Sequence, residues 1–144
     1  MNRKTNNNIL VPTDFSDVAD NALTHAITVA KAYNNEITLL YILEDGILGG
    51  LFSGGQSDVM RDAIKAKLEA KAKEIAENSG VKVHARVESG KVYKTVSKIA
   101  NEDQFDSIIM GSNGASGLEQ IVGSNASRTI QYAEVPAGVV KQNT

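Results

Sequence analysis

Short apolar runs alternate with longer amphipathic stretches along this chain of 144 residues. The run at residues 36–42 has almost no polar interruption, which is typical of a strand covered on both faces of a parallel sheet. Residues 81–88 instead alternate apolar and polar side chains, so we expect a half-exposed strand at a sheet edge. Three further apolar runs predict strands at residues 9–12, 106–110 and 135–140.

The stretches between these runs repeat apolar residues at every third or fourth position. Such spacing places the apolar side chains on one buried face of a helix. Asp14 or Ser16 can cap the first helix, because a short polar side chain accepts a hydrogen bond from the free N–H groups of a helix start. We expect helices over residues 17–33, 60–78, 90–101 and 124–132.

This alternation of strands and helices continues without a break in composition or an internal repeat. It predicts a single α/β domain over residues 1–144, with helices on both faces of a five-stranded parallel sheet. Right-handed crossovers restrict the topology to a doubly wound, Rossmann-like sheet. Pro136 and Gly138 favour an edge position for the last strand. We expect the strand order 3-2-1-4-5, which makes the first and fourth strands neighbours.

Composition and charge narrow the possible functions. The formal net charge is -2, which argues against the basic surface of a nucleic-acid-binding protein. The chain contains no cysteine and only 2 histidines, so thiol chemistry and a cysteine-ligated metal are excluded. No apolar run has the length of a membrane span or a signal peptide, and we therefore expect a soluble cytoplasmic protein.

Two polar loops follow the first and fourth strands, at residues 13–16 and 111–125. In an open doubly wound sheet, ligands bind beyond the carboxyl ends of the strands, where successive crossovers go to opposite faces. The second loop is rich in glycine, and glycine allows backbone N–H groups to approach an anion closely. Ser124 and Asn125 would lie at a helix N-terminus, whose dipole favours negative charge. The two loops therefore predict an anion-binding crevice.

The sequence resembles the universal stress protein family over essentially its whole length. The resemblance is carried by Ile9-Leu-Val-Pro-Thr-Asp-Phe-Ser16, Leu39-Leu-Tyr-Ile42, Ile108-Ile-Met-Gly-Ser-Asn-Gly114, Gly123-Ser124 and Val135-Pro-Ala-Gly-Val-Val140. The ATP-binding branch of that family carries a G-x-x-G motif, a spacer of nine residues and then G-[ST]. Gly111, Gly114, Gly123 and Ser124 resemble this composite motif, with a shortened spacer.

The resemblance implies that the crevice binds ATP together with a divalent cation, Mg²⁺. Asp14 would lie near the nucleotide and its metal, and Pro12 and Thr13 would lie beside the base and ribose. Ile42 and Met110 would contact the adenine. The remaining positions that match the nucleotide-binding loop of the family are Gly111, Ser112, Gly114, Gly123, Ser124 and Asn125.

The shortened, uncharged glycine loop favours a nucleotide-free scaffold instead, and other positions have alternative interpretations. Eight residues, 115–122, separate Gly114 from Gly123, and Ala115 stands where family members often have a cation. Arg128, one turn into the next helix, is the nearest cation that could compensate. Asp14 and Ser124 could also serve only as helix caps, and the glycines only as turn residues. The glycine-rich segment at residues 44–56 could be either a lid or a disordered connection.

We therefore expect a nucleotide-binding regulatory protein of the stress response, with unknown protein partners. No Walker lysine, general base or Ser-His-Asp set is visible, so no enzymatic activity beyond slow ATP hydrolysis is expected. The alternative is a nucleotide-free dimeric interaction protein, while an adenylyl transferase would lack its catalytic signatures. We expect a homodimer through the last strand, from Val135 to Val140, and no functional partner for His25 or His84.

Overall fold

The computed structural model describes residues 5–44, 55–112 and 124–141. Within these ranges, five strands form one parallel sheet in the order β3-β2-β1-β4-β5, which confirms the predicted order. The strands are β1 (Asn8–Pro12), β2 (Glu36–Leu43), β3 (Val83–Ser89), β4 (Ser107–Gly111) and β5 (Ala137–Val140).

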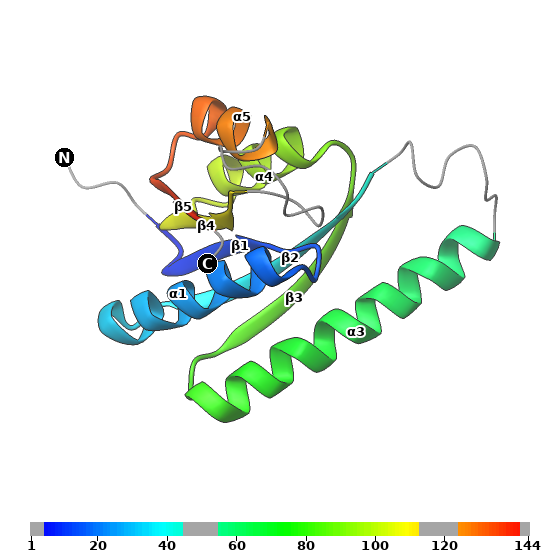
Figure 1. Ribbon diagram of the computed structural model, residues 1–144, viewed down its shortest axis with the longest axis horizontal. Coiled ribbons are helices and arrows are strands. Elements are labelled where there is room, and N and C mark those ends of the chain that lie inside the picture. Colours follow the sequence, from blue (N-terminus) through cyan, green and yellow to red (C-terminus); the bar gives the residue numbers. More distant parts are fainter. Residues whose placement is uncertain (1–4, 45–54, 113–123, 142–144) are drawn as a thin grey trace.

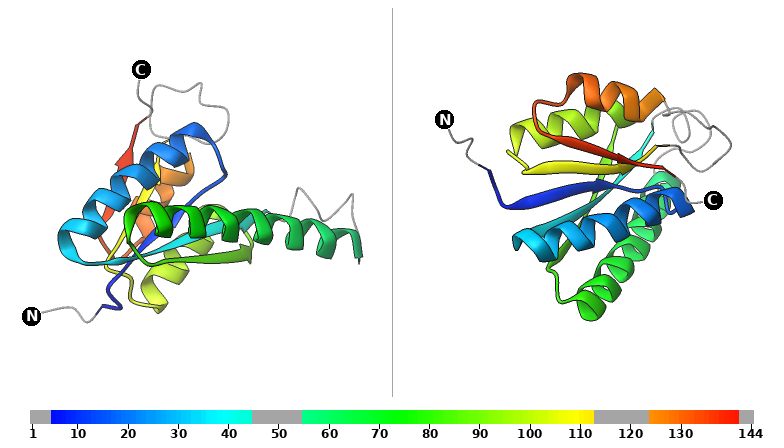
Figure 2. Two further views of the ribbon diagram at one scale, coloured as in Figure 1. Left: turned by 90° about the horizontal axis from the view of Figure 1, so that it is seen from below. Right: turned by 60° about the vertical axis from the view of Figure 1, so that its left-hand side comes forward.

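Helices cover both faces of the sheet, as expected for a doubly wound fold (Figure 1). α1 (Asp17–Tyr33) and α3 (Gly55–Ser79) lie on one face, and α4 (Val92–Glu102) and α5 (Ser124–Tyr132) lie on the other (Figures 1 and 2). α3 begins about one turn earlier than the apolar spacing predicts. Its early residues Asp58, Val59 and Met60 are exposed, so this part of the helix has no buried apolar face that the sequence could reveal.

The core consists of two layers of apolar side chains, one on each side of the sheet. Successive residues of a strand point to opposite faces, so β1 places Ile9 and Val11 in one layer and Leu10 in the other. α1 contributes Ala22 and Ala26 to the first layer. Because both faces are covered, a central strand has little need of polar positions, and this explains the uninterrupted apolar sequence of β2.

The two outer strands have the partial exposure that the sequence predicts. β3 lies at one edge, and none of its residues is fully buried. β5 lies at the other edge, where Gly138 is exposed and the other three residues are half-buried. Among the described helices, none is long and apolar enough to cross a bilayer.

Candidate functional site

The candidate site lies where β1 and β4 meet in the middle of the sheet. The two strands pair in parallel, with Ile9 opposite Ser107 and Leu10 opposite Ile108. Continuing this register places Pro12 level with Met110 at the carboxyl ends of the strands. The chain leaves β1 for α1 on one face, and α5, which follows β4 in the sequence, lies on the other face (Figure 1). This is the topological switch point at which open α/β sheets bind ligands.

The turn after β1 is held in place by its own backbone and side chains. The N–H of Thr13 donates to the carbonyl of Leu40 at 2.9 Å, which ties the turn to β2. The hydroxyl Oγ1 of Thr13 accepts a hydrogen bond from the N–H of Phe15 at 3.0 Å. Thr13 is only 8% exposed, so the residue predicted to lie beside the ribose is mostly occupied in shaping the turn.

The sequence left open whether Asp14 or Ser16 caps the first helix, and the structure gives the two residues different roles. Ser16 is the cap of α1, because its Oγ accepts from the N–H of Ala19 at 3.2 Å. Asp14 is exposed, and its Oδ1 accepts from the N–H of Ser16 at 3.0 Å. Asp14 therefore stabilises the turn without capping the helix, and its carboxylate faces solvent at the carboxyl end of β1.

Phe15 makes contacts that the sequence did not predict. Its φ is 66°, a left-handed conformation that is unfavourable for a bulky side chain. The ring stacks on Tyr41, with 5.3 Å between ring centroids, and Nζ of Lys67 lies 4.3 Å from the Phe15 centroid. Burial raises the pKa of the Tyr41 hydroxyl, and the nearby carboxylates of Asp14 and Glu44 raise it further.

Gly111 at the end of β4 is required by packing against α1. A Cβ atom at this position would lie 2.6 Å from Cγ1 of Val18 and 3.1 Å from the Val18 carbonyl oxygen. The absence of a side chain therefore permits close contact between the strand and the helix whether or not a ligand is bound. The sequence pattern placed this glycine in the phosphate loop but did not predict its contact with Val18.

The structure brings the residues predicted to lie beside the base to one face of the sheet. Met110 belongs to the core layer beneath α4 and α5, and Ile42 packs against the same layer. Pro12, two residues after Leu10, is buried on this side as well. Ser112 is buried too, but its N–H donates to the carbonyl of Val140 at 2.9 Å. The N–H of Ser112 therefore already has a hydrogen-bond partner within the sheet.

The second half of the glycine-rich loop is only partly described. Gly114 and Gly123 lie outside the described residues, as does most of the segment at residues 44–56. Helix α5 begins at Ser124, as predicted, so Ser124 and Asn125 occupy its first two positions. Arg128, the predicted compensating cation, lies against the ring of Tyr93 on α4, with 5.1 Å between its Cζ and the ring centroid.

The described residues contain no ready-made cluster of metal ligands. In the described part of the chain, no group of three or more His, Cys, Asp or Glu side chains is arranged to hold a metal ion. Mg²⁺ commonly uses one or two carboxylates together with substrate phosphates and water. The exposed carboxylate of Asp14 would fit that mode of binding.

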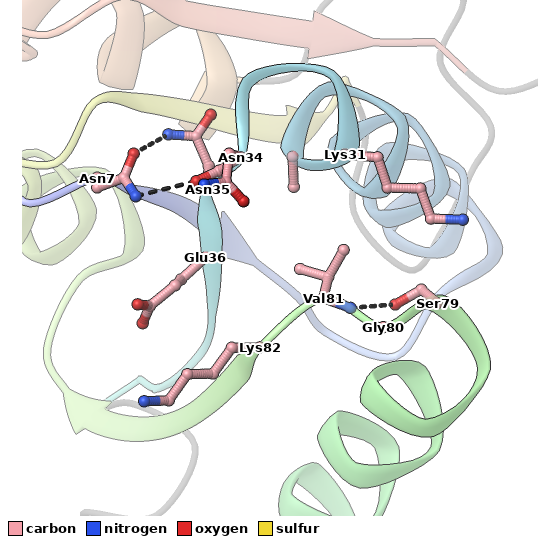
Figure 3. Close-up of a pocket in the computed structure, with 10 residues that line it drawn as sticks. Asn7, Lys31, Asn34, Asn35, Glu36, Ser79, Gly80, Val81 and Lys82 are labelled. Carbon is pink, nitrogen blue, oxygen red and sulfur yellow. Dashed lines mark hydrogen bonds between the residues drawn. The ribbon is translucent and has the colours of Figure 1, made fainter.

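A hollow of about 400 Å³ lies at the opposite end of the sheet, near the amino ends of β1 and β2 (Figure 3). Its lining includes Lys31, Asn35, Glu36 and Lys82. The two lysine side chains extend in different directions and do not converge on one point (Figure 3). Asn35 is already bonded, because its Nδ2 donates to Oδ2 of Asp106 at 2.8 Å. The hollow is therefore bordered by a hydrogen-bonded structural network.

His84 has a structural partner that the sequence did not reveal. Its Nε2 lies 2.7 Å from Oε1 of Glu36 on the neighbouring strand. This hydrogen bond lowers the pKa of Glu36, although partial desolvation opposes the effect and Lys82 supports it. The sequence contains no local signal for the pair, because Glu36 and His84 meet only through the pairing of β2 with β3.

Comparison with known proteins identifies the family. The family model described as "Universal stress protein family" matches residues 5–141. The chain belongs to the universal stress protein family. It is 35% identical over 138 residues to universal stress protein MJ0531 of Methanocaldococcus jannaschii, an alignment that covers 93% of this chain and 81% of the relative.

Solved structures of universal stress proteins have the same fold. One is a universal stress protein in complex with cAMP, with a TM-score of 0.73, 21% identity and coverage of 94% of this chain and 97% of that one. Another is a family member from Arabidopsis thaliana with AMP bound, with a TM-score of 0.67, 16% identity and coverage of 98% and 94%. At these identities the likeness supports the fold, and the nucleotides belong to those two proteins.

Proposed function

We propose that this universal stress protein is a cytoplasmic regulatory protein that binds ATP with Mg²⁺ between the turn at residues 13–16 and the start of α5. The observation that carries the proposal is the pairing of β1 with β4 at the switch point of the sheet. The exposed carboxylate of Asp14 follows β1 at this end of the sheet, and the helix that follows β4 begins at Ser124. Adenine nucleotides in two proteins of the same fold support this choice of ligand.

The two walls of the crevice have complementary roles in this proposal. Asp14 would share the cation with the phosphates, while the free N–H groups at the start of α5 would face phosphate oxygens. Met110 and Ile42 would offer an apolar edge to the adenine. In this proposal the protein acts through conformation and partners rather than through catalysis.

A direct test is calorimetry with Mg-ATP, Mg²⁺-free ATP, AMP and cAMP. We expect Asp14→Asn to weaken Mg-ATP binding by about tenfold, equivalent to about 1.4 kcal/mol, and to affect cAMP less. Asp17→Asn is the matched control, because Asp17 is also exposed but lies in the first turn of α1. Equal losses in both variants would contradict a specific role for Asp14.

The second candidate is a nucleotide-free dimeric interaction protein, favoured by the packing of Gly111. Because Val18 alone accounts for the missing side chain, this glycine does not require a phosphate nearby. The edge strand β5 would supply the contact between protomers, since its outer backbone groups have no neighbouring strand in the described chain. A native mass spectrum of protein purified without added nucleotide would report the ligand and the subunit count together. A ligand-free dimer that also binds no nucleotide in calorimetry would favour this candidate.

A further inference from the structure

Helix α3 is attached to the rest of the protein by few buried side chains. It is 25 residues long, and among its described side chains only Leu68 and Ala72 are buried. Its N-terminal turns extend past the other helices (Figure 2). Ile75 packs against the same core layer, and charged side chains of α3 add contacts with neighbouring elements.

Two of these charged contacts end on the segment that follows Asp14. Nζ of Lys67 lies 4.3 Å from the centroid of the Phe15 ring. Nζ of Lys71 lies 2.9 Å from Oδ1 of Asp20, an ion pair without the geometry of a hydrogen bond. Lys67 and Lys71 are four residues apart, so they project from the same face of α3. Together they fasten α3 to the turn and to the first turn of α1.

The turn that they contact is held in an unfavourable conformation. Phe15 has a positive φ, which an aromatic residue keeps only where its surroundings enforce it. Tyr41 supports one side of the ring by stacking, and Lys67 contributes a cation–π contact. The same turn aligns Asp14, whose Oδ1 is bonded to the N–H of Ser16. Loosening α3 would therefore also loosen the backbone that positions Asp14.

We infer that Lys67 and Lys71 are positioning residues for the nucleotide site, and that docking of α3 and nucleotide binding are coupled through them. The inference rests on the proposed function. A ligand that binds Asp14 in the tight turn favours the state in which α3 is docked. Thermodynamic linkage then requires docked α3 to strengthen ligand binding by the same factor.

The first test needs no ligand and measures backbone hydrogen exchange in the turn and in the first turn of α1. Lys67→Met should speed exchange of the amides of residues 15–20 by roughly 2- to 30-fold, the range expected for loss of a cation–π contact. Lys67→Arg, which keeps a cation over the ring, should restore slow exchange. The matched control is Lys73→Met, because Lys73 is exposed on the same helix and its nearest carboxylate, on Glu77, is 4.0 Å away.

The second test adds Mg-ATP at about 100 times its dissociation constant. Exchange of the α3 amides from 64 to 75 should slow by up to about 100-fold if undocking requires release of the turn. Lys67→Met should reduce both this protection and the affinity for Mg-ATP, and Lys73→Met should change neither.

The outcomes separate this inference from the proposed function. If Mg-ATP binds but exchange in α3 does not change, the coupling is refuted and the proposed function stands. If calorimetry detects no nucleotide binding, the proposed function and the coupling both fail. The ligand-free measurement still decides whether Lys67 positions the turn, and equal exchange in the Lys67→Met and Lys73→Met variants would refute that role.

Discussion

Gly111 and Val18 are packed so closely that a methyl group on Gly111 would lie 2.6 Å from Cγ1 of Val18. The backbone carbonyl of Val18 is also near, at 3.1 Å from the same point. A rotation of the Val18 side chain would relieve only the first of these contacts. The end of β4 and the start of α1 are therefore fixed relative to each other at the switch point of the sheet.

We predict that Gly111→Ala lowers the free energy of unfolding by about 1–3 kcal/mol, the usual cost of adding a methyl group to a well-packed region. Urea denaturation monitored by circular dichroism measures the change. Gly138→Ala is the control, because the nearest atom to its added methyl group would be 3.9 Å away. Equal destabilisation by the two substitutions would show that the contact with Val18 is not the cause.

Asp14→Asn should lower the pKa of the Tyr41 hydroxyl. Burial raises this pKa most, so the pKa should stay above its ordinary value of 10.0 after the Asp14 charge is removed. A pH titration of the Tyr41 Cζ chemical shift in tyrosine-labelled protein measures the change. Asp17→Asn should leave the titration unaltered, and an unchanged Tyr41 in the Asp14→Asn variant would rule out an electrostatic link between the turn and β2.

Glu36 should contribute stability that the protein loses in acid. His84 holds the pKa of Glu36 below its ordinary value of 4.5, so the folded state binds a proton less readily than the unfolded chain. This contribution is fully present above pH 4.5 and is lost as the pH falls through the lowered pKa of the folded state.

The check is the urea midpoint as a function of pH for the wild type and for Glu36→Gln. The variant should lose less stability than the wild type as the pH falls below 4.5. Glu77→Gln serves as the control, because Glu77 is 64% exposed and its paired lysine is 4.0 Å away. Parallel pH profiles for the wild type and Glu36→Gln would show that Glu36 is not a source of the acid sensitivity.

Asp106 should be a strong determinant of stability at the amino ends of the strands. Its Oδ1 accepts from the N–H of Asn7 at 3.1 Å, and its Oδ2 accepts from Nδ2 of Asn35 at 2.8 Å. Asp106→Ala removes both acceptors and should cost about 1–3 kcal/mol of unfolding free energy. Asp106→Asn keeps one oxygen acceptor and should cost less.

Thermal or urea denaturation of these two variants tests the network. Glu102→Ala is a suitable comparison, since Glu102 is exposed at the end of α4. A cost for Asp106→Ala no larger than that for Glu102→Ala would mean that the hydrogen bonds to Asn7 and Asn35 add little net stability.

Much of the fold could be predicted because local patterns report burial directly. The apolar run of β2 predicted a strand covered on both faces and the alternating residues of β3 predicted an edge strand, and both predictions are confirmed. The start of α3 could not be predicted as well. Residues 58–60 near its start are exposed, so no buried face marks this part of the helix.

The sequence predicted where the candidate site lies, but it did not predict most of the contacts around it. The pairing of β1 with β4 confirms that the turn at residues 13–16 and the end of β4 are neighbours. The contact of Lys67 with Phe15 could not be predicted, because it joins residues more than fifty positions apart. The hydrogen bond from His84 to Glu36 was missed for the same reason.

The sequence by itself determined the order of elements, the faces they bury and the family to which the chain belongs, because hydrophobic period, turn residues and glycine spacing are local properties. The tertiary structure decided which turn residue caps α1, why Gly111 has no side chain, and which lysines of α3 contact the Asp14 turn. These relationships depend on distances of a few ångströms between elements that are remote in the chain. Such distances are set only when the sheet and both helical layers pack together.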